Sequence, residues 1–562
     1  MVMTKFGNSG KMWESLLKFG IGFMVIMLVN LLVSNYILRV DLTEEKRFTI
    51  SEATKSMLRD LDDVIYIEVF LEGELPAGMR RLKTAIRERL DEFRVFSHQK
   101  IQFQFIDPSQ AISDKARQEF HSNLANRGLQ PIRLFDNEGG KNVAKIIFPG
   151  AIITYHEQEK PVMLLRGKGG QSAINQSIEG LEYELASAIR TLTSREKKKI
   201  GLIKGHRESD SLSLAGLTSV LAESYNVFNV NLPERNRLEG YDAVIIAKPK
   251  KAFSEADKFK LDQYIMSGGK ALFFLDQLYV NEDSALSHGT FALPVDVNLD
   301  DQLFKYGVRV NRDLVLDLSS GVMPVIVNMI GDEPEIQNFK WHYYPIINQF
   351  GKHPIVKNSD AIYGKFINTV DTVKADGIVK TPLLFSSRYS KKVSAPARVA
   401  LEDIVQLGQK DFEQREPFPV AYLLEGSFNS LYRNRFIPKG LGKQDLIEKS
   451  VPTKIMVVGD GDIIENEFSM KTRQPVELGF SEFMKQKFAN EDFIKNSLQY
   501  MLDDHGLITA RNKEIKIRPL NEVKVGEERL FWQVLNMGLP IVLIIIYGLI
   551  RYYWRKRRFT RF

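Results

Sequence analysis

The sequence predicts an α/β protein whose folded body lies between two membrane-spanning helices. One observation is an apolar segment near each end of the 562-residue chain. The second is the alternation of short apolar runs with helical patterns between those segments. The third is an ordinary composition of 44% hydrophobic and 26% charged residues, which argues against a disordered chain. This length also exceeds one typical domain, so more than one core is expected.

The first apolar segment covers residues 16–38 and reads LLKFGIGFMVIMLVNLLVSNYIL. About 20 such residues cross the hydrocarbon core of a bilayer at 1.5 Å per residue. A cleavable signal peptide is the alternative, but the run is long and no small-x-small cleavage pattern precedes Arg39. We therefore expect an uncleaved anchor, with residues 1–15 as a cytoplasmic N-terminus.

The second apolar segment covers residues 532–550 and contains no charged residue. It begins with Trp532 and is followed by the basic tail RYYWRKRRFTRF at 551–562. An interfacial aromatic residue and a basic flank are typical of a span whose basic end is cytoplasmic. A buried core helix is the alternative reading. Two spans predict a membrane protein with both termini in the cytoplasm and the body between the spans outside it.

The region 40–194 is expected to form a small α/β domain. A helix capped by Thr49 or Ser51 is followed by a strand, a long helix and a second strand, an order that implies two parallel strands. A later hairpin and a final helix complete a thioredoxin-like layout. The predicted elements after the capped helix are a strand at 64–71, a helix at 79–96, a strand at 101–106, hairpin strands at 145–155 and 160–165, and a helix at 175–192.

The region 198–510 is expected to form a larger α/β domain, with 511–530 as a linker to the second span. Several of its apolar runs do not alternate with polar residues, which is typical of strands covered on both faces in an open doubly wound sheet. The outline is flavodoxin-like or glutamine-amidotransferase-like. No strand order is predicted for 298–418. Strands are expected at 200–203, 227–230, 243–247, 271–275, 420–424 and 454–458, and helices at 214–223, 255–266 and 492–502.

Composition and motifs exclude several functions. The net charge of +7 comes mostly from the C-terminal tail, so no nucleic-acid-binding surface is indicated. The chain has no cysteine, which excludes disulfides, zinc thiolate sites and a thiol nucleophile. The GKGG at 167–170 lacks the complete phosphate-binding pattern, and neither a GxSxG nor an HExxH motif is present. We expect no catalytic residue, resident metal or cofactor.

Two polar loops that follow predicted strands are the candidate crevice residues. GHRESD at 205–210 offers His206 and Glu208 as acid, base or metal-binding groups, although a polar loop is the simpler reading. VVGDGDIIEN at 457–466 offers Asp460 and Asp462, whose oxygens suit calcium or magnesium, but the EF-hand spacing is missing. The aromatic group at 341–344 could form a ligand platform, or belong to a core or interface.

Several longer phrases resemble the gliding-motility-associated ABC transporter auxiliary proteins of Bacteroidota, the GldG family. The resemblance runs from about residue 40 to the end of the chain. It rests on these segments: LTEEKRFTISEATKSML, FIDPS, INQSIEGLEYELASAIRTLT, IGLIKGHRES, LDQYIMSGGKALFFLD, YGVRVNRDLVLD, VVGDGDIIEN and IRPLNE.

The resemblance implies a non-catalytic subunit that associates with an ABC permease and a cytoplasmic ATPase, in a complex for gliding motility and surface-protein secretion. Membrane lipid and periplasmic components of motility or secretion are the other expected partners. The absence of an amidotransferase-type cysteine nucleophile agrees with a binding or scaffolding role. Two alternatives stay open: a periplasmic small-molecule or glycan receptor for an importer, and a tethered cell-wall hydrolase that uses Glu208, Asp460 or Asp462.

Overall fold

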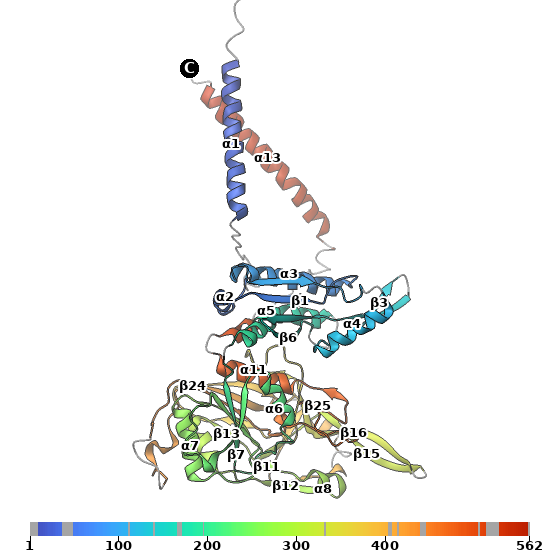
Figure 1. Cartoon of the computed structure of the whole chain (residues 1–562), viewed down its shortest axis with the longest axis vertical. Helices are drawn as coiled ribbons and strands as arrows, with labels where there is room; N and C mark the ends of the chain where they lie inside the picture. Colours follow the sequence, from blue (N-terminus) through green and yellow to red (C-terminus); the bar gives the residue numbers. More distant parts are fainter. Residues whose placement is uncertain are drawn as a thin grey trace, which may run out of the picture. The chain divides into compact units, whose positions relative to one another are not determined.

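The computed structural model separates into two compact units, residues 1–513 and 514–562, and each is described by itself (Figure 1). The first unit contains helix α1 (Ser9–Asn35) and a mixed α/β body, and the second contains helix α13 (Arg529–Phe559). The described residues are 9–35, 49–110, 113–138, 141–165, 171–194, 196–330, 333–402, 407, 409–412, 415–438, 446–503, 506–512, 526 and 528–559.

One helix among the described residues, 529–557, is long and apolar enough to cross a membrane, and an apolar stretch of 18 residues within it has a mean hydropathy of 2.1. A shorter apolar stretch, Leu16–Leu28, lies within α1. Residues 36–38 of the first predicted span fall outside the described residues. The C-terminal segment thus has the length and composition of a span, whereas the first segment has weaker support and the two-span topology stays a prediction.

A four-stranded sheet forms the centre of the small α/β domain. Its strand order is β2-β1-β5-β6, with β1 parallel to β2 and antiparallel to β5. Helix α3 crosses over between the parallel strands and buries one apolar stripe that includes Met79, Leu82 and Ile86. The strands are β1 (Ile65–Val69), β2 (Ile101–Phe105), β5 (Gly150–Tyr155) and β6 (Gln158–Met163), and the crossover helix is α3 (Ala77–Phe96).

Other helices of this domain depend on local capping and on packing. Helix α2 (Glu52–Arg59) begins at Ser51, whose hydroxyl accepts a hydrogen bond from the backbone N–H of Thr54, as expected. Helix α5 (Gln171–Thr193) packs against α3. Helix α4 (Asp114–Asn126) and strand β3 (Ile132–Glu138), which pairs with β4 (Lys141–Ile147), were not predicted. The run predicted as one strand at 145–155 is divided between β4 and β5.

An eight-stranded sheet forms the larger domain, in the order β17-β20-β23-β24-β10-β9-β7-β8. The strands from β24 to β8 pair in parallel, and the other three add antiparallel neighbours. All six strands predicted for this domain lie in the sheet. The strands are β7 (Lys199–Lys204), β8 (Asn226–Asn231), β9 (Ala243–Ala247), β10 (Lys270–Phe274), β17 (Gln349–Phe350), β20 (Ile378–Phe385), β23 (Pro419–Gly426) and β24 (Thr453–Val458).

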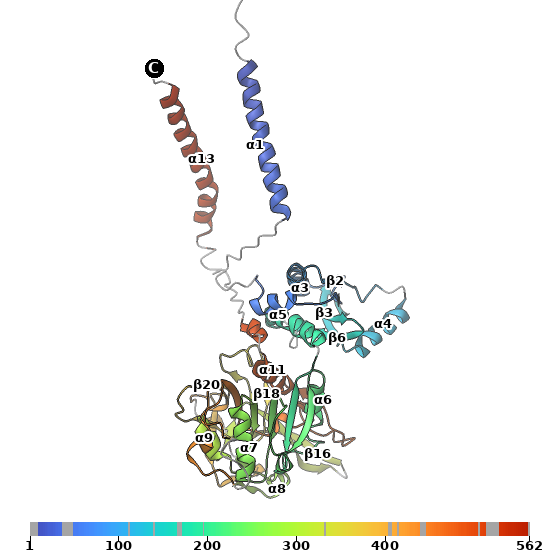
Figure 2. The same cartoon turned by 60° about the vertical axis from the view of Figure 1, so that its left-hand side comes forward.

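Helices cover both faces of this sheet (Figure 2), which explains why its parallel strands are apolar without alternation. On one face, α6 (Ala215–Ala222) and α11 (Asn490–Leu502) pack over Ile245 of β9. On the other face, α7 (Glu255–Met266) and α9 (Asp300–Tyr306) pack over Ile246 of the same strand. Adjacent residues of β9 therefore belong to two different cores.

Short strands and one long hairpin occupy most of 298–418, the region without a predicted order. The hairpin pairs β15 with β16 and extends from the body (Figure 1). The shorter elements here and in the adjoining loops are η1 (Leu232–Glu234), β11 (Leu278–Tyr279), α8 (Glu282–Ser287), β12 (Thr290–Pro294), β13 (Val308–Val310), β14 (Asp313–Asp317), β15 (Ser320–Ile330), β16 (Glu333–Ile347), β18 (Ile362–Tyr363), β19 (Val370–Thr372), β21 (Ser390–Ser394), β22 (Ala397–Val399), η2 (Gln409–Asp411), η3 (Leu431–Asn434), η5 (Asp462–Ile464), β25 (Phe480–Ser481), β26 (Gln486–Lys487) and η6 (Leu507–Asn512).

Candidate functional site

Loops at the carboxyl ends of β7, β9, β10 and β24 lie along one edge of the parallel sheet. Ligands of open α/β proteins bind at this edge, because polar loops meet there above the apolar strands. Lys248 directly follows β9, Asp276 follows β10, and Asp460 and Asp462 follow β24. The GHRESD loop follows β7. The strand order therefore brings both predicted loops to the same edge.

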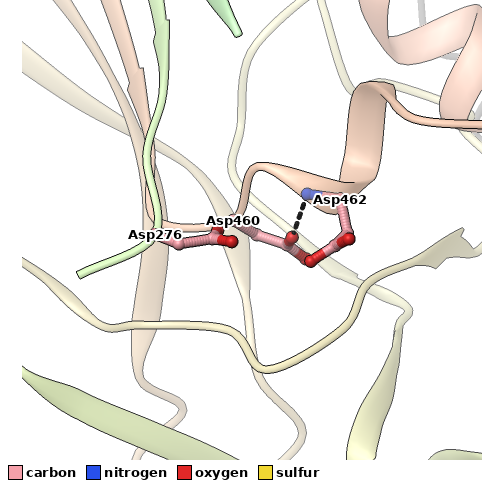
Figure 3. A group of neighbouring side chains, drawn as sticks. All are labelled: Asp276, Asp460 and Asp462. Carbon is pink, nitrogen blue, oxygen red and sulfur yellow. Dashed lines mark hydrogen bonds between the residues drawn. The ribbon is translucent and has the colours of Figure 1, made fainter. Parts of the chain in front are cut away.

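Three aspartates from two of these loops form a carboxylate cluster (Figure 3). One carboxylate oxygen from each of Asp276, Asp460 and Asp462 lies within 4.8 Å of the others. The backbone N–H of Asp462 donates to Asp460 Oδ1 at 2.7 Å, and that of Gly461 donates to Asp276 Oδ1 at 2.6 Å. The second oxygen of Asp460 accepts from the backbone N–H of Lys365 at 3.0 Å. These bonds fix the cluster to the backbone.

The ammonium group of Lys248 compensates part of the negative charge. Its Nζ lies 2.5 Å from Asp462 Oδ1, 3.1 Å from Asp276 Oδ2 and 3.6 Å from Glu465 Oε2. Burial alone would lower the pKa of Lys248, but the three carboxylates outweigh it and raise that pKa well above its usual value. We call Lys248, Asp276, Asp460, Asp462 and Glu465 the carboxylate–lysine cluster.

The acids of this cluster differ in proton affinity. Burial, followed by the charges of Asp462 and Asp276, raises the pKa of Asp460 well above its ordinary value. Burial also raises the pKa of Asp276 and of Glu465. Burial opposes ionisation of Asp462 as well, but Lys248 and Lys365 bring its pKa below the usual range. Asp462 is therefore the ionised partner of the lysine, and Asp460 is the most readily protonated.

The donor set suits a hard cation, since magnesium and calcium prefer carboxylate oxygens. However, the ammonium of Lys248 already contacts two of the three aspartates that a metal would use. A divalent ion would have to displace it and desolvate the site again. The arrangement is therefore that of an internal ion-pair network that joins three strand ends.

A second lysine extends this network. Lys365 Nζ lies 3.0 Å from Glu467 Oε1 and 5.0 Å from the ring centroid of Tyr344. Burial opposes its charge, but Glu467 and Glu282 raise the pKa of Lys365 above its usual value. Tyr344 and Trp341 are completely buried. The aromatic group at 341–344 thus belongs to the core, which contradicts the reading as a ligand platform.

The residues His206 and Glu208 form a separate contact at the same sheet edge. His206 Nδ1 lies 3.1 Å from Glu208 Oε1, its Nε2 lies 3.2 Å from Asp257 Oδ2, and its ring stacks on Phe253 at 3.6 Å between centroids. With only 2% of its surface exposed, His206 is held on both ring nitrogens and is not presented to solvent. This geometry favours a structural role over that of a base or a metal ligand.

One contact connects the two loops. The hydroxyl of Ser209 donates to Glu465, which lies in the carboxylate–lysine cluster. The structure therefore places all four predicted crevice residues at one edge, as two pairs: His206 contacts Glu208, and Asp460 contacts Asp462. Lys248, Asp276 and Glu465 were not predicted as site residues. Lys248 and Asp276 are charged residues within two positions of a buried strand end, and Glu465 directly follows η5; such positions are too common to be specific alone.

Glycines of the GDGD loop are required by close packing. A Cβ on Gly461 would lie 2.6 Å from Lys248 Cβ, and one on Gly459 would lie 2.2 Å from the carbonyl oxygen of Asn368. Lys248 itself has a left-handed backbone with φ of 52°, which is uncommon for a residue with a side chain. The loop and the lysine are therefore fitted to each other. The 167–170 GKGG segment lies outside the described residues.

Comparison with known proteins gives the chain its family. Residues 197–497 match the family model described as ABC-type uncharacterized transport system, and residues 44–154 match a domain family of unknown function. An uncharacterized protein of Borreliella burgdorferi is 24% identical over 97% of this chain and 99% of its own length. The two matched regions do not overlap.

Similarity to solved structures is low. The mmIFT52 N-terminal domain has 14% identity and a TM-score of 0.31, over 54% of this chain and 97% of its own. A putative ThuA-like protein from Parabacteroides merdae has 11% identity and a TM-score of 0.25, over 58% of this chain and 94% of its own. The topology therefore stands on the strand pairings above. On the family match, the chain belongs to the ABC-type uncharacterized transport system family, as an auxiliary protein of such a system.

Proposed function

We propose that this protein is a membrane-anchored, non-catalytic subunit that connects an ABC permease and its ATPase to periplasmic partners. The observation that carries the proposal is a contact inside the body between α2, the first described helix after α1, and η6, the last described element of the first unit. The chain therefore enters and leaves its folded body at one place, and both predicted anchors are tethered there.

This junction belongs to the small domain even though η6 follows the larger one. The buried side chain of Leu507 in η6 packs in the small-domain core with Leu58 of α2. The guanidinium of Arg511 lies 5.2 Å from the ring centroid of Tyr183 on α5, and its Nη2 donates to the carbonyl of Lys357 at 2.8 Å. Force from either membrane segment would thus reach the same group of packed helices.

Helix α5 connects the junction to the larger domain. Arg190 Nη1 on α5 lies 2.7 Å from Asp503 Oδ1, just after α11, and the other oxygen of Asp503 accepts from the backbone N–H of Ile508 in η6 at 3.0 Å. Tyr183 donates to Gln499 of α11. The small domain, η6 and the large sheet are thus connected by polar contacts as well as apolar ones, as a coupling role requires.

The domain types predicted from the sequence belong to this proposal. The order β2-β1-β5-β6, with a parallel pair followed by an antiparallel hairpin, supports a thioredoxin-like fold for 40–194. The parallel order β8-β7-β9-β10-β24 supports a flavodoxin-like or amidotransferase-like fold for 198–510. We place both termini in the cytoplasm and the body in the periplasm, because the basic end of α13 favours the cytoplasmic side.

The proposal also includes a biological process and the absence of catalysis. The phrases shared with the gliding-motility auxiliary proteins support a role in gliding and surface-protein secretion. The lysine-neutralised carboxylates and the doubly held His206 support a body without catalysis. A strain whose gene is deleted should then lose surface translocation, and complementation with H206Q should restore it.

Replacement of the second span tests the coupling role. Residues 532–550 are exchanged for an unrelated apolar helix of equal length, and a scrambled segment of the native composition serves as a second variant. We expect the body to remain in the membrane fraction, while recovery of the permease or transport-coupled ATPase activity falls. Unchanged assembly and activity with both replacements would contradict a coupling role for this helix.

A further inference from the structure

An open cavity of about 850 Å³ lies in the larger domain, apart from the carboxylate–lysine cluster. Segments far apart in the sequence enclose it, namely α9, β13 with the turn after it, and parts of β19, β21 and the η3 segment. Its volume is in the range of small-molecule sites. None of its lining residues belongs to the carboxylate–lysine cluster.

Cationic side chains from several of these segments converge on the cavity. Lys305 comes from α9, Arg309 from β13, Arg312 from the following turn, Lys392 from β21 and Arg435 from the end of the η3 segment. The side chains of the three arginines and Lys392 are between 44% and 58% exposed. Their charged groups are therefore available to a ligand that enters from solvent.

Four aspartates also line the cavity, but other groups already hold them. Asp371 accepts from Asn311 Nδ2 at 2.8 Å, and Asp300 accepts from Gln277 Nε2 at 2.9 Å. Asp313 accepts from both the backbone and the hydroxyl of Thr369, at 2.9 and 2.6 Å. Asp301 accepts from the buried Lys258 at 2.8 Å. These donors keep each carboxylate hydrogen-bonded even when a neighbouring cation moves away from it.

The cations, by contrast, are loosely held. Arg309 makes one contact with Asp371 at 3.2 Å, Arg312 makes one with Asp300 at 3.3 Å, and Lys392 is 3.8 Å from Asp313. Lys305 has no ion-pair partner among the described residues. Exposed single contacts of this kind contribute little free energy, so exchange for a ligand is inexpensive. Only Arg435 is closely engaged, at 2.5 Å from Asp301.

We propose that this cavity binds a small, soluble, phosphate-bearing ligand through Lys305, Arg309 and Arg312. Guanidinium groups donate two parallel hydrogen bonds to phosphate oxygens, and a flexible lysine adds a point charge. Asp371 and Asp300 keep Arg309 and Arg312 near the cavity before the ligand arrives, and the aspartates repel ligands whose negative groups fall elsewhere. The site is independent of the proposed coupling role, and it gives the larger domain a ligand of its own.

Calorimetric titration of the full-length protein in mild detergent with pyrophosphate tests the site. The variants are K305Q and the pair R309Q/R312Q. The matched control is R433Q, since Arg433 is an exposed arginine two positions from Arg435, is paired with Glu448 at 3.4 Å and does not line the cavity. Thermal unfolding without pyrophosphate verifies that each variant is folded, and K305Q removes no ion pair among the described residues.

We expect saturable binding by the native protein and by R433Q. The affinity should fall about threefold or more in K305Q and about tenfold or more in R309Q/R312Q, because each substitution removes a charge-assisted hydrogen bond. Absence of saturable binding at low salt would overturn the proposal. Equal affinity in the cavity variants and in R433Q would also overturn it, because the bound phosphate would then depend on general surface charge.

Discussion

Lys248 Nζ lies 2.5 Å from Asp462 Oδ1, and this ion pair connects the end of β9 to the loop after β24. Strand β10 lies between these two strands, and its Asp276 contacts the same ammonium. One lysine therefore closes the carboxyl edge of three neighbouring strands. Of the residues that first suggested a crevice or metal site, Asp462 is paired with this internal charge.

Substitution of Lys248 by methionine should destabilise the protein by about 3–5 kcal/mol, since it leaves buried carboxylates without their partner. The exposed Lys250 provides the control, and K250M should unfold like the native protein. Denaturant unfolding of the full-length protein in detergent measures both. A K248M variant as stable as K250M would show that the cluster contributes nothing to the fold.

The same variant should acquire sensitivity to divalent cations. Without the ammonium, the aspartates whose oxygens lie within 4.8 Å of one another offer an uncompensated oxygen site. Millimolar magnesium or calcium should raise the melting temperature of K248M relative to a chelator, while the native protein should show no difference. A native protein that is stabilised by these ions to the same degree would mean that the lysine does not take the place of a metal.

Asp460 should give the protein a stability that falls as the pH rises. Burial raises its pKa, so between its ordinary pKa and the raised folded value the folded state binds a proton that the unfolded chain has released. The stability that Asp460 contributes is then greatest below this pH window and is lost as the pH rises through it. In D460N this component should be absent, which unfolding free energies from pH 4 to 8 would reveal. Parallel pH profiles for D460N and the native protein would refute it.

Asp462 should act in the opposite direction. Lys248 and Lys365 lower its pKa despite burial, so its contribution is present above the ordinary pKa and is lost as the pH falls through the folded value. D462N should therefore lose stability at neutral pH and change little at acid pH. Unfolding free energies measured at neutral pH and extended well below pH 4 check this expectation, because the lowered pKa of Asp462 lies in that acid range. A loss confined to low pH would contradict it.

Gly461 should not tolerate alanine. The new Cβ would lie 2.6 Å from Lys248 Cβ, so either the loop or the lysine must move, at a cost of about 1–3 kcal/mol. Gly180 in α5 has no atom within 4 Å of such a Cβ, and G180A should be neutral or slightly stabilising. Denaturation midpoints compare the two. Equal midpoints would indicate that the GDGD loop is not closely packed against Lys248.

Asp503 should control the mobility of η6. D503A removes both the ion pair with Arg190 and the acceptor for the Ile508 N–H, so the η6 amides should exchange with solvent about tenfold faster. D492A, an exposed substitution on α11, provides the control. Hydrogen exchange of the full-length protein gives the rates. Unchanged exchange at 507–512 in D503A would remove the polar part of the proposed junction.

Much of the fold followed from local patterns. The apolar run 243–247 coincides with β9, and the run 271–275 overlaps β10 (Lys270–Phe274); burial on both faces accounts for their lack of alternation. The Ser51 cap could be predicted from the sequence, because its hydroxyl accepts a hydrogen bond from a residue only three positions further along the chain. The break between two strands in the run 145–155 could not be predicted, because Phe148 and Pro149 separate the strands while the sequence remains apolar. The region 298–418 pairs strands distant in sequence, which local periodicity cannot order.

The candidate site was predicted only in part. Asp460 and Asp462 stand two residues apart, so their loop was visible as a motif. Asp276 and Lys248 join them from other strands, and only the sheet order brings these residues together. His206 was read as a possible base because its neighbours in space, Asp257 and Phe253, lie about fifty residues away. The charged side chains could be read from the sequence, but their charge state and their exposure to solvent depend on tertiary contacts.

Purification of the tagged full-length protein from its native membrane in mild detergent, followed by mass spectrometry of the proteins recovered with it, tests whether the protein is a subunit of a transport complex. We expect a permease and an ATPase in stoichiometric amounts. Recovery of the protein alone, from membranes in which the permease and the ATPase are shown to be present and extracted, would contradict its role as a transport-system subunit.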